Sequence, residues 1–126
     1  MKPPTSLDEV ILEVVGAIPR GALAAYGDVC EVVRELGFAC TPRRVARTMS
    51  AYGGQPGVAW WRVVQATGTL AEPVAAAAAS HLLAEGVEVR GRLVPLADRR
   101  WSPTPADVAS IAARLDPGGP GDQVRR

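Results

Sequence analysis

The sequence has little of the chemistry on which most enzymes and metal sites depend. Among 126 residues there are one histidine, His81, and two cysteines, Cys30 and Cys40. A metal site needs several such ligands, and neither a second histidine nor a pair of cysteines at two-residue spacing accompanies His81. Glycine-rich phosphate or dinucleotide loops and a pair of hydrolase carboxylates are also missing. These absences predict no catalytic residue, no metal and no cofactor, and we expect both cysteines to be buried, inert thiols.

Long apolar runs and an excess of charge of one sign are lacking as well. No run reaches the roughly 18 residues that span a bilayer, and the first four residues contain no hydrophobic segment typical of a signal peptide. Two cysteines cannot form a series of disulfide bonds, which favours a reducing compartment. We therefore expect a cytoplasmic protein without a membrane partner. The net charge of +1 gives no bulk attraction to nucleic acid, so any such affinity requires a local basic patch.

What the chain does contain is typical of one globular domain, with 48% apolar and 21% charged residues. Ser6 and Glu9 form a capping-box pattern at the start of an apolar stripe, which predicts a helix from Leu7 to about Ile18. Further stripes predict helices over 27–36 and from Pro42, capped by Thr41, towards Gly53. The last two helices, joined by a short turn, are a helix-turn-helix candidate.

The second half of the chain predicts shorter elements. The Trp- and Val-rich residues 58–65 indicate an extended segment, and 74–84 a helix. Residues 87–90 and 93–94 flank Gly91 and Arg92 as a tight hairpin or wing. We expect an α/β, mainly α, winged-helix-like domain over residues 1–103, with a helix-turn-helix and short strands. A C-terminal helix over 104–116 and a flexible tail over 117–126 are expected to follow.

The third predicted helix carries the basic patch. Arg43, Arg44 and Arg47 lie in its first turns, where the helix N-terminus adds positive potential. The small residues Ala46 and Ser50 would let this helix approach a surface closely. Contacts from the arginines to DNA phosphates would be independent of sequence and sensitive to salt. A solvated basic face explains the same pattern equally well.

Five short motifs occur in a characteristic order along the chain. They are Ile18-Pro19-Arg20-Gly21, Ala25-Tyr26-Gly27-Asp28-Val29, Pro42-Arg43-Arg44-Val45-Ala46-Arg47, Ala59-Trp60-Trp61-Arg62-Val63-Val64 and Glu85-Gly86-Val87. This series resembles the DNA-binding domain of O6-alkylguanine-DNA alkyltransferases, and specifically the alkyltransferase-like proteins. The resemblance covers about residues 7 to 101.

Trp60 decides which activity the resemblance implies. In the alkyltransferases the four residues matching 59–62 are Pro-Cys-His-Arg, and that cysteine accepts the alkyl group; the alkyltransferase-like proteins commonly have tryptophan there. An indole forms no thiolate, and Trp61 stands in place of the histidine, so the resemblance implies no enzymatic transfer. It implies instead a protein that binds O6-alkylguanine in duplex DNA, flips the base and flags it for nucleotide excision repair.

The resemblance also implies roles for individual residues. Arg43 would enter the duplex and fill the gap left by the flipped nucleotide, while Tyr26 would press on the flanking phosphate. Trp60, with Trp61 and Val63, would line the lesion pocket together with Tyr26.

The basic helix would dock in the minor groove, which the small Ala46 permits, with Arg44 and Arg47 on phosphates. The expected partners are duplex DNA containing O6-alkylguanine and nucleotide excision repair proteins. We expect a monomer associated with the nucleoid. The segment 69–73, with Glu72, departs from the family, whose residues there include glycine, asparagine and tyrosine or arginine; Glu72 would repel a phosphate.

Simpler interpretations remain open at each of these positions. Tyr26 fits a core residue at a helix start, Arg43 an ordinary surface arginine, and one of Trp60 and Trp61 a core residue. Two other functions are also open. A winged-helix regulator would read undamaged DNA sequence, and an active alkyltransferase would use Cys30 or Cys40.

Overall fold

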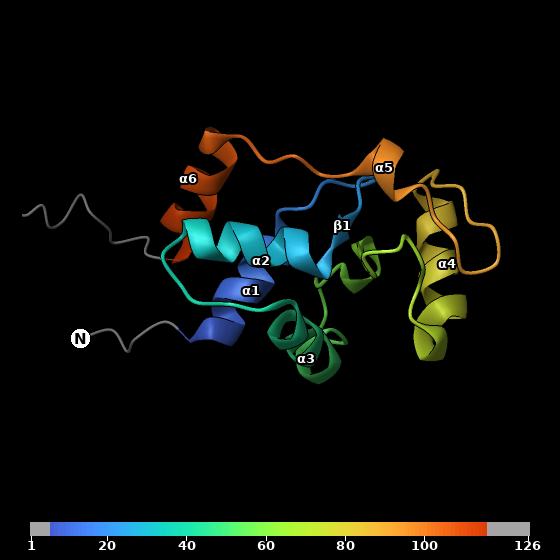
Figure 1. Ribbon diagram of the computed structural model, residues 1–126, viewed down its shortest axis with the longest axis horizontal. Coiled ribbons are helices and arrows are strands. Elements are labelled where there is room, and N and C mark those ends of the chain that lie inside the picture. The colour runs from blue at the N-terminus through green and yellow to red at the C-terminus, as the bar shows by residue number, and fades with distance from the viewer. Residues whose placement is uncertain (1–5, 116–126) are drawn as a thin grey trace, which may run out of the picture.

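A computed structural model of the chain describes residues 6–115 (Figure 1). The predicted tail over 117–126 and residue 116 of the expected C-terminal helix lie outside the described residues. No helix in the described part is both long and apolar enough to cross a membrane. The elements are α1 (Leu7–Gly16), β1 (Ala24–Ala25), α2 (Tyr26–Glu35), α3 (Pro42–Tyr52), the 3-10 helix η1 (Trp60–Arg62), β2 (Val63–Val64), the 3-10 helix η2 (Glu72–Val74), α4 (Ala75–Ala84), α5 (Leu96–Arg99) and α6 (Pro105–Leu115).

Helices α1 and α3 begin as their caps predict, and α2 begins one residue before the predicted start, at Tyr26. Ser6 Oγ accepts from the Glu9 backbone N–H at 3.1 Å, and the Glu9 carboxylate accepts from the Ser6 backbone N–H at 2.9 Å. Thr41 Oγ1 accepts from the Arg44 backbone N–H, and Pro42 occupies the first turn of α3. Helices α2 and α3 pack on each other and on α1. The mainly helical fold with a helix-turn-helix is therefore confirmed.

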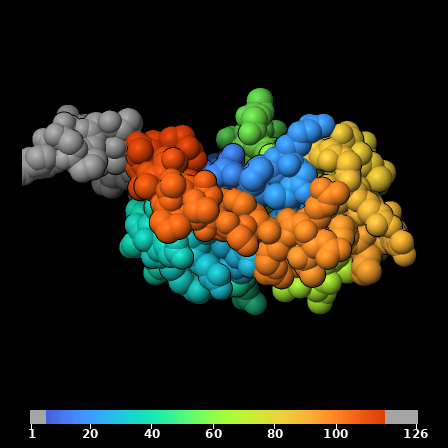
Figure 2. All heavy atoms as spheres, turned by 90° about the horizontal axis from the view of Figure 1, so that it is seen from above, coloured from blue at the N-terminus to red at the C-terminus, as the bar shows by residue number. Residues whose placement is uncertain are grey.

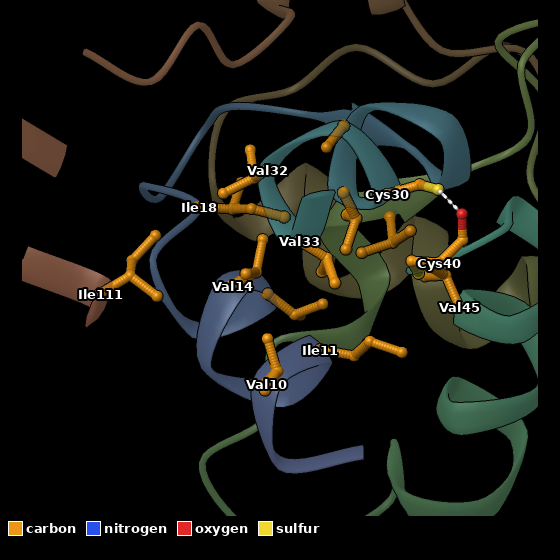
Figure 3. Packing of buried hydrophobic residues seen from close by; sticks show 14 of the residues in the cluster. Val10, Ile11, Val14, Ile18, Cys30, Val32, Val33, Cys40, Val45 and Ile111 are labelled. Carbon is orange, nitrogen blue, oxygen red and sulfur yellow. Dashed lines mark hydrogen bonds between the residues drawn. The ribbon is translucent and has the colours of Figure 1, made fainter. Parts of the chain in front are cut away.

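One apolar cluster, here called the helical core, joins α1, α2, α3 and α6 (Figure 3). Its fully buried members include Val10 and Ile11 of α1, Val33 of α2 and Ile111 of α6. The two thiols lie in the same core, where Cys30 Sγ donates to the Cys40 carbonyl at 2.9 Å. Both cysteines are free and buried, as expected.

A second cluster, here called the distal core, surrounds α4 at the other end of the molecule (Figure 1). Only Ala78 and Leu82 come from a long helix. The remaining buried members come from strand ends, loops and the short α5: Leu23, Ala25, Val64, Leu70, Val87, Val94 and Leu96.

The two-stranded parallel sheet divides the two cores. Ala24 pairs with Val63, and Ala25 with Val64. Successive strand residues point to opposite faces, so Ala24 and Val63 enter the helical core while Ala25 and Val64 enter the distal core. A sheet of only two residues per strand thus holds both halves of the domain together.

Two local expectations need correction. Residues 58–65 are not extended throughout, because Trp60–Arg62 forms a 3-10 turn and only Val63–Val64 is a strand. Arg90 and Leu93 exchange backbone hydrogen bonds of 2.9 and 2.8 Å, so the tight turn is present. Its flanks, however, form isolated bridges in place of regular strands.

The C-terminal helix α6 belongs to the same globule as the preceding residues. It packs against α1 and buries Ile111 in the helical core, and Arg114 pairs with Glu13 at 2.9 Å. Seen from above, the chain from α5 to α6 runs along one face and links the two ends of the molecule (Figure 2). Trp101, on this connection, is buried in the helical core.

Candidate functional site

A pocket of about 520 Å³ opens between α3 and α4. Among the residues singled out from the sequence, the structure brings Tyr26, Ala46, Trp60 and Val63 together around it. Its remaining lining comes from the second half of α3 and the glycines after it, from the 70–74 segment, and from α4: Met49, Ser50, Gly53, Gly54, Leu70, Ala71, Pro73, Val74 and Ala78. The pocket therefore lies where the helical and distal halves of the molecule meet.

Tyr26 reaches the pocket from the first residue of α2. Its neighbour Ala25 is held because the backbone N–H of Ala25 donates to the Asp28 carboxylate at 2.9 Å. Arg100 pairs with the same carboxylate at 2.8 Å, which ties the start of α2 to the chain after α5. Burial raises the pKa of the Tyr26 phenol, so this side chain is a neutral hydroxyl at physiological pH.

Trp60 forms one wall of the pocket from the 3-10 turn η1. Its Cβ lies so close to Gly53 that a side chain there would meet it at 3.3 Å and the Met49 carbonyl at 2.5 Å. Glycine at position 53 therefore permits the close approach of η1 to the end of α3. The Trp60 ring is held edge-on by the rings of Trp61 and His81, each with a centroid distance of 5.9 Å.

Trp61 is not among the residues that line the pocket. Its ring stacks on His81 at 3.8 Å with an interplanar angle of 8°, and its Nε1 donates to Glu85 at 2.8 Å. Both rings border a neighbouring groove formed with residues 53–59. The structure thus separates Trp61 from Tyr26, Trp60 and Val63, with which the family resemblance grouped it.

Glu85 is the centre of a buried polar cluster, here called the carboxylate clamp, made of Glu85, Arg62, Trp61 and Gly21. Arg62 Nη2 lies 2.7 Å from Glu85 Oε2, and the two side chains are 15% and 3% exposed. The Gly21 backbone N–H donates to Glu85 at 2.9 Å, and Arg62 Nη1 donates to the Ile18 carbonyl at 2.8 Å. Each acceptor of the carboxylate is therefore satisfied by a donor from a distant part of the chain.

The clamp governs the ionisation of Glu85. Burial by itself raises the pKa of this carboxyl, but hydrogen bonds from Arg62, Gly21 and Trp61 outweigh it and lower the pKa to about 2. Sequence reasoning missed this cluster. Its signal was present, because Ile18–Gly21, Trp61-Arg62 and Glu85 belong to three of the five motifs whose joint occurrence carried the resemblance.

The arginines of α3 are not equivalent. Arg43 and Arg47 are exposed, whereas Arg44 Nη2 pairs with Asp8 at 2.9 Å. Asp8 also accepts from the Thr48 hydroxyl at 2.7 Å, and the bonds from Thr48 and Arg44 lower the pKa of its carboxyl. Within residues 6–115 neither Arg43 nor Arg47 forms an ion pair, so both can contact an external partner, while Arg44 also fastens α3 to α1. Phosphate contact by all three stays a prediction.

Metal chemistry has no candidate ligand cluster in the described residues. Over 6–115, no group of three or more histidine, cysteine or acidic side chains could hold a metal ion. The chemistry available at the pocket is therefore that of an apolar wall, a neutral phenol and a nearby basic helix.

The helix-turn-helix, with exposed arginines on its second helix, defines the class of the protein as a helix-turn-helix DNA-binding domain. The family profile described as 6-O-methylguanine DNA methyltransferase, DNA binding domain, matches residues 6–87. The chain belongs to this family.

Solved structures agree with that assignment. The crystal structure of S. pombe Atl1 in complex with damaged DNA containing O6-carboxymethylguanine is 27% identical, with a TM-score of 0.65 over 78% of this chain and 99% of that chain. A structure of S. pombe ATL in complex with DNA, at 23% identity and a TM-score of 0.59 with the same coverage, supports the fold alone. No curated protein sequence matches.

Proposed function

We propose that this protein binds O6-alkylguanine in duplex DNA and holds the extruded base in the pocket between α3 and α4, without removing the alkyl group. The observation that carries the proposal is the position of Trp60 as a wall of a cavity of about 520 Å³ beside the basic helix. This volume lies in the range of small-ligand pockets and suits a nucleobase with a substituent. The S. pombe relative, solved with O6-carboxymethylguanine DNA, supports the same ligand class.

Binding without transfer follows from the side chains at hand. The indole of Trp60 has no thiolate, so it cannot displace an alkyl group from guanine O6. Cys30 and Cys40 are buried in the helical core and neither lines the pocket. Burial and the neighbouring Cys30 thiol raise the pKa of Cys40 to about 11, which disfavours its nucleophilic form. These observations argue against an alkyltransferase that uses either cysteine.

Base extrusion accounts for the arrangement around α3. An O6-alkyl group weakens pairing, so the few kcal/mol needed to unstack a normal guanine are reduced for the lesion. Arg43 is exposed near the start of α3 and would fill the vacated position in the duplex. Tyr26, at the pocket edge, would bear on the flanking phosphate, and Arg44 and Arg47 would contact phosphates. Ala46, which lines the pocket, lets α3 approach the minor groove.

Among residues 6–115, no thiol, histidine or carboxylate lines the pocket, so removal of the bound lesion would fall to other proteins. We propose that the kinked complex is presented to nucleotide excision repair, and that the protein acts as a cytoplasmic, nucleoid-associated monomer.

A binding titration tests the proposal with two duplexes that differ only by O6-methylguanine in place of guanine. We expect the lesion duplex to bind at least tenfold more tightly, and Trp60→Ala and Arg43→Ala to reduce that preference. Arg47→Ala is the matched control, since loss of a phosphate contact weakens both duplexes equally. Equal affinities in wild type would favour a regulator that reads undamaged sequence and would defeat the proposal.

A further inference from the structure

One side of the pocket is formed by a short segment between β2 and α4. Leu70, Ala71, Pro73 and Val74 line the pocket from this segment, which contains the 3-10 turn η2. Its own backbone bonding is local, since the Val74 N–H donates to the Ala71 carbonyl at 3.1 Å. A local bond fixes the shape of a turn but not its place on the molecule. The place of this side of the pocket therefore depends on contacts with other parts of the chain.

Leu70 is bonded at both of its backbone groups to one residue, Arg92. The Leu70 N–H donates to the Arg92 carbonyl at 2.7 Å, and the Leu70 carbonyl accepts from Arg92 Nη1 at 3.0 Å. The first bond uses only the backbone of residue 92, whereas the second requires a side chain that carries a donor. Leu70 is 2% exposed, so water has little access to its carbonyl if the guanidinium is removed.

The turn that carries Arg92 is fixed by its own geometry. Gly91 has a φ of 63°, which a tight turn of this kind requires and which glycine adopts without strain. Just after the turn, the Val94 N–H donates to the Gly68 carbonyl at 2.8 Å, so the turn is held against the loop that leads to Leu70. Within residues 6–115 Arg92 forms no ion pair, and no carboxylate competes for its side chain.

From these contacts we infer that Arg92 is a positioning residue of the pocket: its side chain holds Leu70, and through Leu70 the segment 70–74, in place against the bound base. The inference rests on the proposed function and concerns the same pocket. The Trp60 ring, on another side, is supported by Trp61 and His81. A wall that is already in place makes binding of an extruded base less costly, but it does not affect a duplex whose bases stay stacked. Loss of the Arg92 side chain should therefore weaken lesion binding selectively.

Titration of Arg92→Ala with the O6-methylguanine duplex and the matched guanine duplex tests this role. We expect the ratio of the two affinities to fall about fivefold, the effect of one typical hydrogen bond, with faster dissociation of the lesion complex. Arg92→Gln keeps a side-chain donor and should retain more of the ratio. The matched control is Arg90→Ala, which removes the same charge two residues away, where the side chain pairs with the exposed Glu88. It should leave the ratio unchanged.

The other outcomes of this titration are distinct. An unchanged ratio in Arg92→Ala would overturn the positioning role and leave lesion binding intact. Equal weakening of both duplexes, with a flatter salt dependence, would make Arg92 a phosphate contact and would overturn the role as well. If the wild type binds the two duplexes equally, the proposed function itself is wrong, and the inference with it.

Amide hydrogen exchange in the free protein tests the same role without DNA. Arg92→Ala should speed exchange of the Leu70 and Val74 amides at least about threefold, while the Ile11 amide in the helical core keeps its rate. Arg90→Ala should leave all three rates unchanged. Equal rates at Leu70 and Val74 in wild type and Arg92→Ala would show that the side chain does not hold the segment, and would overturn the inference.

Discussion

The helical core and the distal core hold the two halves of this protein together by different means. The helical core draws most of its buried side chains from the long helices α1, α2, α3 and α6, and most of them are aliphatic. The distal core has one long helix, α4, and its other members come from strand ends, loops and the short α5. Loops bury fewer contiguous side chains than helices, so the second half depends more on hydrogen bonds between distant segments.

The carboxylate clamp supplies those bonds. Glu85 follows α4 directly and receives donors from Gly21, Trp61 and Arg62, which lie 23 to 64 residues away in the sequence. One buried carboxylate thus fastens α4 to the turn after α1 and to η1. Helix α3, on one side of the pocket, is held by apolar burial and by the Asp8 contact, while α4, on the other side, combines a smaller apolar face with the carboxylate clamp at its end.

The largest expected effect is on the helical core. Ile11→Ala removes a fully buried side chain of α1 and should lower the free energy of unfolding by about 4 kcal/mol. Urea denaturation at neutral pH measures the change. Leu83→Ala, on the exposed face of α4, is the control and should cost about 0.5 kcal/mol or less. Similar losses from both substitutions would contradict the placement of Ile11 in the helical core.

The next effect concerns the clamp and its pH dependence. The pKa of Glu85 is about 2 in the folded protein and 4.5 in its ordinary state, so its stabilisation is complete above about 4.5. That stabilisation is lost as the pH falls from 4.5 towards 2. Glu85→Gln carries no titrating carboxyl. Over this interval the wild type should therefore lose up to about 3 kcal/mol more unfolding free energy than the variant.

Urea denaturation of both proteins between pH 6 and pH 2 measures this difference. Glu88→Gln is the matched control, because Glu88 pairs with Arg90 at an exposed site where both side chains are more than half accessible. Its profile should follow that of the wild type. If the unfolding free energies of the wild type and Glu85→Gln fell in parallel with pH, the carboxylate clamp would not stabilise the distal half.

A smaller effect is expected at the ion pair of Asp8 in α1 with Arg44 in α3. Asp8→Asn weakens the bonds from Arg44 and Thr48, and should lower the unfolding free energy by about 1 kcal/mol. It also releases Arg44, so affinity for undamaged duplex should rise and its salt dependence should steepen. Asp98→Asn, an exposed change on α5, makes the same change of charge away from α3. An equal gain in DNA affinity from both variants would mean that net charge alone is responsible.

The smallest effect is expected at the aromatic stack. His81→Ala removes the ring that stacks on Trp61 at 3.8 Å and should cost about 0.5 to 1 kcal/mol. Because His81 also contacts the edge of Trp60, lesion affinity should fall slightly as the pocket wall loosens. Ser80→Ala, the exposed neighbour on α4, controls for a change of helix propensity. Unchanged stability and tryptophan fluorescence in His81→Ala would show that the stack contributes nothing.

The helices were predictable because their signals are local. The capping box at Ser6, the proline at the start of α3 and apolar stripes of helical period specify α1, α2 and α3 within a residue or two. The turn at η1 was missed because Trp and Val favour strands by composition. In the structure the donor bonds of Trp61 and Arg62 to Glu85 hold these residues in a 3-10 turn.

Part of the candidate site was also predictable from the sequence, because the five motifs mark individual positions. The motif positions of Tyr26, Ala46, Trp60 and Val63 come together around one pocket. The adjacent Trp61 stacks on His81 and does not line the pocket, and the order of the two tryptophans in the sequence does not indicate which ring lines a cavity. The clamp was missed because Glu85 and Arg62 are ordinary charged residues until folding brings them to 2.7 Å.

By itself, the sequence determined where the long helices begin and end, that α3 carries the arginines, and that an indole stands at position 60. Each of these follows from neighbours within about four residues, the range of caps and of helical side-chain contacts. Only the tertiary structure decided that two cores form on either side of a two-residue sheet, that Arg44 is held by Asp8, and that no charged side chain among residues 6–115 lines the pocket. Those outcomes depend on contacts between residues more than 20 positions apart in the sequence. Such contacts stabilise the protein only once both cores have packed.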